Sequence, residues 1–199
     1  MNMLSLIDQF PKLRGHITLF SVNPVTQAVS QLVYSKNKIM DGASLGTAKL
    51  WGGVNTYKPG AIYFEFQNLA SPGDTPEYPT FEHTEGVEYY TGLDYSTTKD
   101  FLRVPILVSP NVINTVNGYL LTLYAISPDV DVGFWEKPFT GASNSVVIGG
   151  AVVATPTGVQ SDDVILCRSY PTGTKIFKTT GEQIGITWNV EFPYPLSES

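Results

Sequence analysis

Charged residues are scarce in this sequence. Asp, Glu, Lys and Arg make up 15% of the 199 residues, whereas about 25% is usual in globular proteins. The 12 Lys and Arg are scattered and are outnumbered by 18 Asp and Glu, which gives a net charge of −6. Because nucleic acids are bound through clustered basic residues, this balance argues against them as partners. A neutral polar surface instead favours contact with other proteins.

Cysteines and long apolar runs are also missing. Cys167 is the single cysteine, so no disulfide can form within the chain, and its place in VILC predicts a buried, inert thiol. The apolar run at 146–154 is far too short to span a membrane. At the start of the chain there is no basic region, and Asp8 interrupts the apolar stretch that a signal peptide needs. We therefore expect a protein made in the cytoplasm, without a membrane partner.

No catalytic motif is present either. The nucleophile elbow, the P-loop, the dinucleotide fingerprint and zinc-ligand spacings do not occur. The pair Gly149-Gly150 lies inside an apolar strand, where a bulge explains it best. Two carboxylates for glycoside hydrolysis need only be close in space, and nothing in the sequence points to such a pair. We expect no enzymatic activity and no cofactor.

Acidic residues gather at three places, and each of these is a candidate cation site. They are Glu82, His83, Glu85 and Glu88; Asp129 and Asp131; and Asp162 and Asp163. Carboxylates and imidazoles do bind divalent cations, but the ligand rhythm of an EF-hand is absent. Exposed acidic loops are the simpler interpretation, so no metal site is assigned. A weaker hypothesis is a metal-dependent hydrolase around Glu82, His83 and Glu85.

Alternating apolar residues predict β-strands along most of the chain. In AIYFEFQN, at 61–68, Ile62, Phe64 and Phe66 share one face, and the other face carries Tyr63, Glu65 and Gln67. The closing segment at 184–192 has the clearest period of two. Further strands are expected at 15–23, 28–35, 101–109, 118–127, 145–154, 163–169 and 174–178. Nine or ten strands predict an all-β fold: a single-domain antiparallel β-sandwich, jelly-roll-like, over residues 1–199.

The sequence predicts a single short helix over residues 42–51, with Asp41 as its N-cap and Gly52-Gly53 as its C-terminal stop. Gly42 and Gly46 each weaken this helix by roughly 1 kcal/mol relative to Ala. It must therefore be held by packing on a sheet. We expect it to close one edge or end of the sandwich like a lid, through Leu45, Leu50 and Trp51.

Two segments are candidates for interactions. Residues 1–12 can form an N-terminal arm that docks on a neighbour, with a turn or two of helix before Pro11 as the alternative. Residues 69–100 form a long loop, and a connection of that length is usually functional or flexible. Loop aromatics commonly anchor protein interfaces, although they also stack on sugars or pack under their own loops. The possible interface residues are Tyr78, Phe81, Tyr89, Tyr90 and Tyr95, with Phe134 and Trp135 in a second loop.

The order of features near the N-terminus resembles a pattern common in structural proteins of tailed bacteriophages. There, a strand that begins with Gly leads through a hairpin to a second strand, an Asn-x-Ile segment, a short helix with Gly and Ala, and an aromatic strand. The matching segments are Gly15-His16-Ile17-Thr18, Asn23-Pro24, Leu32-Val33-Tyr34, Asn37-Lys38-Ile39, Asp41-Gly42-Ala43 and Ala61-Ile62-Tyr63-Phe64-Glu65-Phe66. Ile184-Gly185-Ile186-Thr187-Trp188 is similar to the closing strand of those proteins.

This resemblance covers residues 13–68 and 181–192. It implies a virion protein of the head, neck, tail or baseplate (for example a head decoration protein), bound to other virion proteins as a homo-oligomer or a symmetric array. It carries over no catalytic residues. The alternative is a receptor- or glycan-binding β-sandwich module of a phage tail, in which the loop aromatics hold a host-surface glycan.

Overall fold

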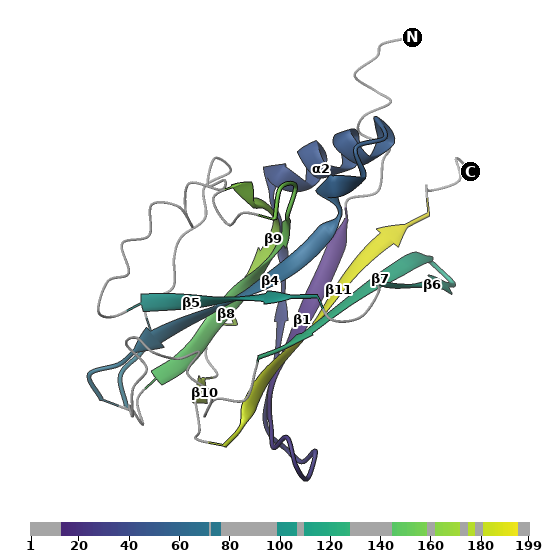
Figure 1. Cartoon of the computed structure of the whole chain (residues 1–199). Coiled ribbons are helices and arrows are strands. Elements are labelled where there is room, and N and C mark those ends of the chain that lie inside the picture. The colour runs from purple at the N-terminus through teal and green to yellow at the C-terminus, as the bar shows by residue number, and fades with distance from the viewer. Residues whose placement is uncertain are drawn as a thin grey trace.

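The computed structural model describes most of the chain and shows two sheets packed face to face (Figure 1). Within the described residues there are eleven strands, one α-helix and one short 3-10 helix. The predicted all-β sandwich with one short helix is confirmed. The described residues are 13–71, 73–76, 99–106, 110–127, 145–158, 162–171, 175–177 and 181–194.

The first sheet, sheet A, has five strands in the order β2-β1-β11-β7-β6. All of its pairs are antiparallel, and β1 and β11, the first and last strands, are neighbours from Arg14 opposite Glu191 to Val22 opposite Gln183. The bounds are β1 Arg14–Val22, β2 Val29–Lys36, β6 Asn111–Thr115, β7 Gly118–Ile126 and β11 Gln183–Pro193. Strand β6 was not predicted from the sequence.

The second sheet, sheet B, has six strands in the order β3-β9-β8-β4-β5, with β10 also paired to β8. Strands of the two halves of the chain pair in nested order, β1 with β11, β3 with β9 and β4 with β8, as in a long hairpin rolled into two layers. Strand β5, which contains Pro105, lies at the end of this order, where a proline costs no ladder hydrogen bond. The bounds are β3 Lys38–Ile39, β4 Pro59–Asn68, β5 Lys99–Pro105, β8 Ser145–Ala154, β9 Val164–Ser169 and β10 Ile176–Phe177.

The main core lies between the sheets and follows the predicted alternation. Its fully buried side chains include Ile17 and Leu19 of β1, Ile62, Phe64 and Phe66 of β4, and Ile186 and Trp188 of β11. The opposite face of β4 is buried as well, because Tyr63, Glu65 and Gln67 are all below a tenth exposed. Beside Gly149 the register between β4 and β8 slips by one residue, so the predicted bulge is confirmed.

Helix α2, Asp41–Trp51, lies across one end of the sandwich next to β9 (Figure 1), and the 3-10 helix Asn55–Tyr57 follows it. Its N-cap is Met40, which makes no side-chain capping bond, so the predicted cap at Asp41 is wrong by one position. The predicted glycine stop is confirmed, since Gly53 has a φ of 82°. No helix among the described residues is long and apolar enough to cross a membrane.

The helix is attached through small residues rather than through the large ones that were expected. A Cβ on Gly42 would lie 2.0 Å from the Ile165 carbonyl oxygen, and one on Gly46 would lie 3.1 Å from Leu166 Cδ2. Leu45 is 44% exposed and Trp51 is 86% exposed, while Leu50 is half-buried. The lid is therefore correct in place but wrong in its contacts, because the glycines bring the helix backbone directly onto β9.

Candidate functional site

Most of the site residues expected from the sequence lie outside the described residues. This holds for all seven possible interface aromatics, Tyr78, Phe81, Tyr89, Tyr90, Tyr95, Phe134 and Trp135, for the N-terminal arm, and for most of the long loop. It also holds for the acidic groups at 82–88 and 129–131. The glycan-binding alternative therefore stays a prediction. Among the described residues, no cluster of three or more His, Cys, Asp or Glu side chains could hold a metal ion.

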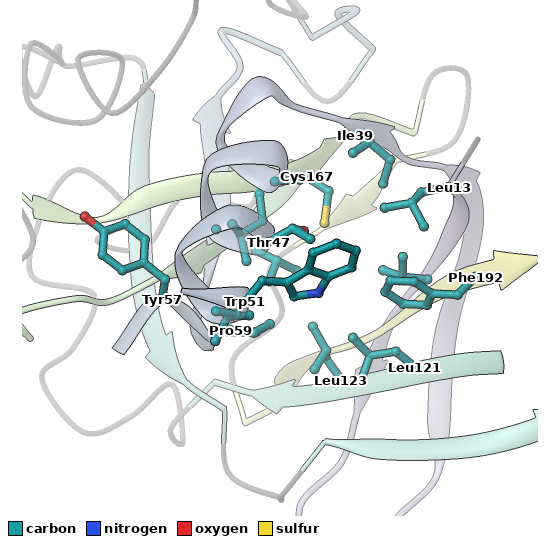
Figure 2. A pocket seen from close by; sticks show the side chains of 16 residues that line it. Leu13, Ile39, Thr47, Trp51, Tyr57, Pro59, Leu121, Leu123, Cys167 and Phe192 are labelled. Atoms are coloured by element: carbon teal, nitrogen blue, oxygen red, sulfur yellow. The ribbon is translucent and has the colours of Figure 1, made fainter. Parts of the chain in front are cut away.

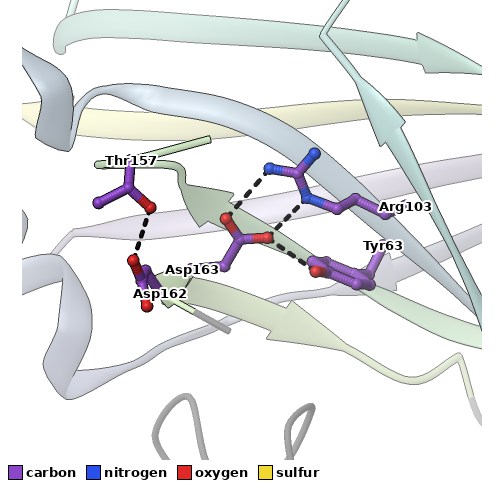
Figure 3. Close-up of polar contacts among 5 residues, drawn as sticks. All are labelled: Tyr63, Arg103, Thr157, Asp162 and Asp163. Carbon is purple, nitrogen blue, oxygen red and sulfur yellow. Dashed lines mark hydrogen bonds and ion pairs between the residues drawn. The ribbon is translucent and has the colours of Figure 1, made fainter. Parts of the chain in front are cut away.

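Of the three acidic groups singled out in the sequence, the structure describes only Asp162 and Asp163. These two carboxylates bind different side chains of the same chain (Figure 3). Asp163 accepts hydrogen bonds from Arg103 Nε at 2.7 Å and Nη2 at 3.1 Å, and from the Tyr63 hydroxyl at 2.7 Å. Asp162 instead accepts one from Thr157 Oγ1 at 2.6 Å. Burial, followed by the Asp163 carboxylate, raises the pKa of Tyr63 well above its ordinary value, so this phenol stays neutral. The cluster fastens the segment before β9 to β4 and β5.

A second polar cluster lies on the same face of sheet B. Arg168 Nη2 lies 3.1 Å from Glu65 Oε1, and the Tyr170 hydroxyl donates to Glu65 Oε2. The guanidinium also stands 5.2 Å from the centre of the Tyr170 ring. Arg168 is fully buried and the Glu65 side chain is 5% exposed, so water does not reach this ion pair. We assign both clusters to the stability of sheet B rather than to binding.

Cys167 is buried in the main core, as the sequence predicted. Burial raises the pKa of its thiol from 9.0 to about 12. The thiolate is the reactive form of cysteine, so a thiol with this pKa is almost entirely unreactive near neutral pH.

We expect iodoacetamide to leave Cys167 unmodified in the folded protein at about pH 8 and to modify it fully after unfolding in guanidinium chloride. Intact-mass spectrometry reads both states directly. Rapid alkylation of the folded protein would show that the thiol is open to solvent and would contradict its place in the core.

An apolar pocket of about 260 Å³ lies at the same end of the sandwich as helix α2 (Figure 2). The helix forms one wall, and strands of both sheets form the others. Thr47 and Leu50 line it from the helix, Leu121, Leu123, Val190 and Phe192 from sheet A, and Ile39, Val152, Leu166 and Cys167 from sheet B; Leu13, Ala43, Gly46, Trp51, Tyr57 and Pro59 complete the lining. Such a lining suits an apolar side chain or small molecule.

Trp51 and Leu13 belong to this pocket but come from opposite sides of it. The indole of Trp51 lies between the helix and Phe192 of β11 (Figure 2) and is 86% exposed. Leu13 is the first described residue and directly precedes β1. A large aromatic ring left in water beside an apolar hollow is typical of a site that another group covers.

Strand β6 forms one end of sheet A and is the second candidate surface. All five of its residues are exposed, and among the described strands it pairs only with β7. From 110 to 117 the chain carries no charge, and Val112 is 60% exposed. Natural edge strands are commonly blunted by charged residues or by Pro within the strand. Residues 111–115 have neither, so within the described part of the chain nothing blocks pairing at this edge.

The outer face of sheet A has one uncharged, partly apolar row beyond the end of β6, whereas the row that reaches β6 at Ile113 contains Arg14 and Glu191. Tyr34, Thr18, Thr187 and Tyr124 lie opposite one another in successive strands and form an uncharged row. Phe20 lies over Gly185, where a Cβ would be 2.2 Å from the ring, and stacks on Tyr124 with a centroid distance of 6.3 Å. Side chains in facing positions of adjacent strands share a face, so these residues form one continuous patch.

Known proteins give no further guidance. No family model, no curated protein and no solved structure matches the chain. The resemblance to tailed-phage structural proteins therefore stays a prediction, and the surfaces of the chain itself carry the functional argument.

Proposed function

We propose that this protein is a structural component of a bacteriophage virion and works through protein–protein contacts. The virion assignment rests on the resemblance of residues 13–68 and 181–192 to tailed-phage structural proteins. The mode of action rests on the surface of sheet A. The observation that carries it is the uncharged edge strand β6, which pairs only with β7 among the described strands.

An open edge offers unpaired backbone N–H and C=O groups to another strand. Adding a strand satisfies these groups, and the side chains beside the edge then provide specificity. Here those side chains include Val112 and Ile113, both exposed and apolar. Pairing at β6 would remove them from water and extend sheet A across the contact.

A second copy of the chain is the natural partner for this edge. Two β6 strands can pair in antiparallel fashion about a twofold axis, so that the same residues face one another from both copies. The net charge of −6 opposes self-association in general. The absence of charge between residues 110 and 117 removes that repulsion at this edge.

Val112→Lys tests the proposal, because each copy of the chain then brings one positive charge to the contact between the two β6 strands. We expect the unchanged protein to associate in light scattering, and the variant to associate at least about tenfold more weakly. The matched control is Val25→Lys, the same substitution at a residue that is 88% exposed in the turn between β1 and β2. It should leave association unchanged.

Two results would overturn the proposal. A protein that stays monomeric at every concentration would remove the role of β6 in self-association. Mass spectrometry of purified virions that never detects the protein would remove the virion assignment.

A further inference from the structure

We propose that the pocket beside Trp51 is the docking site for the chain's own N-terminal segment, residues 1–12, and that Phe10 is the side chain that enters it. This inference does not depend on the proposed function, although the pocket is close to β6, since Leu121 in its lining lies opposite Val112. It rests on the chemistry of the pocket, on where the chain leaves it, and on the sequence of the segment.

The lining of the pocket favours the binding of an apolar group. Its walls are formed mainly by Leu, Ile, Val and Phe side chains, and no charged residue lines it. A cavity of about 150 Å³ with such walls holds a benzene molecule, so a pocket of about 260 Å³ has room for a phenyl ring. The exposed face of Trp51 would gain an aromatic neighbour at the same time.

The described part of the chain begins at the pocket. Leu13 lines the pocket and Arg14 starts β1, so the twelve residues before Leu13 must leave from this place. Phe10 is three positions away, and its Cα therefore lies at most about 11 Å from that of Leu13. A tether this short gives an effective concentration of the order of millimolar or more, which favours this segment over a free ligand.

The segment has the composition that docking requires, and its sequence favours a turn before Leu13. Six of its twelve residues are apolar and large: Met1, Met3, Leu4, Leu6, Ile7 and Phe10. In Phe10-Pro11-Lys12-Leu13, Pro occupies the second position of a four-residue turn, where its fixed φ is favourable. A turn at these residues would reverse the chain and direct Phe10 back to the pocket.

Trypsin cleavage after Lys12 tests the docking, because a bond held in a docked turn is cut only when the segment opens. The full chain is used at a protein concentration at which light scattering finds it monomeric, so that self-association through β6 plays no part. Intact-mass spectrometry follows the loss of residues 1–12. We expect Phe10→Ala to speed this loss about tenfold, whereas Gln9→Ala, its polar neighbour, should leave the rate unchanged.

Thr47→Phe tests the same docking from the pocket side. Thr47 is an exposed helix residue that lines the pocket, so a phenyl group there fills the space without disturbing the core. It should speed the cleavage after Lys12 as Phe10→Ala does. Equal rates for the parent, Phe10→Ala and Thr47→Phe would overturn the proposal. Protection that appears only as protein concentration rises would also overturn it, since a second copy's segment would then be the occupant.

Discussion

Glu65→Gln should lower the free energy of unfolding by about 3–5 kcal/mol. Glu65 is the buried carboxylate that faces the fully buried Arg168, with 3.1 Å between Oε1 and Nη2. Gln keeps the shape of the side chain and removes its charge. The buried guanidinium would then lose the negative charge of Glu65, and losing one partner is the costly way to break a buried ion pair.

Urea unfolding followed by linear extrapolation measures this loss. Glu191→Gln is the matched control, since Glu191 is exposed on β11 and its change should stay within about 0.5 kcal/mol. Replacing both partners, Glu65→Leu with Arg168→Met, should recover most of the stability, because no charge is then left buried. A loss below about 1 kcal/mol for Glu65→Gln would mean that Arg168 does not need the carboxylate.

This ion pair also shows why the sequence predicted only part of the sheet. The alternation in AIYFEFQN identified β4 and its inner face correctly, since Ile62, Phe64 and Phe66 are buried. Period two separates two faces but does not say whether the second one is covered. The partners of that face, such as Arg168, lie about a hundred residues away in the chain, so no local pattern could reveal them.

Strand β6 was missed for a different reason. Residues 111–115 have Asn at two positions and no alternation of apolar and polar side chains. A signal was nevertheless present, because Asn117-Gly118 between two β-rich runs is a strong hairpin signal. The structure has that hairpin, with Thr115 opposite Gly118. Turn chemistry would have found the strand that periodicity did not.

The contacts that helix α2 makes with the sheet could not be foreseen from its sequence. Large side chains such as Leu45 and Trp51 were expected to make the contacts, because apolar residues usually point to the core. The contacts are instead made where side chains are absent, at Gly42 and Gly46. Glycines in a helix look like weaknesses in a sequence, and only the position of β9 shows that they are points of close approach.

Gly42→Ala should therefore destabilise the protein by about 3 kcal/mol, although Ala is the better helix former by about 1 kcal/mol. The new Cβ would lie 2.0 Å from the Ile165 carbonyl oxygen and 2.8 Å from Val164 Cγ1. Because the nearer atom belongs to the backbone, no rotamer change relieves the contact. The first turn of helix α2 must move away from β9, and Met40, buried just before it, must move as well.

Gly46→Ala is the matched control in the same helix. Its Cβ would meet the flexible Leu166 side chain at 3.1 Å, and that side chain can shift by a few tenths of an ångström. The gain in helix propensity then offsets the contact, so the free energy of unfolding should change by less than about 1 kcal/mol. Denaturant unfolding of both variants, measured under the same conditions, compares their free energies of unfolding. Equal effects of the two substitutions would mean that close approach at Gly42 does not hold the helix on the sheet.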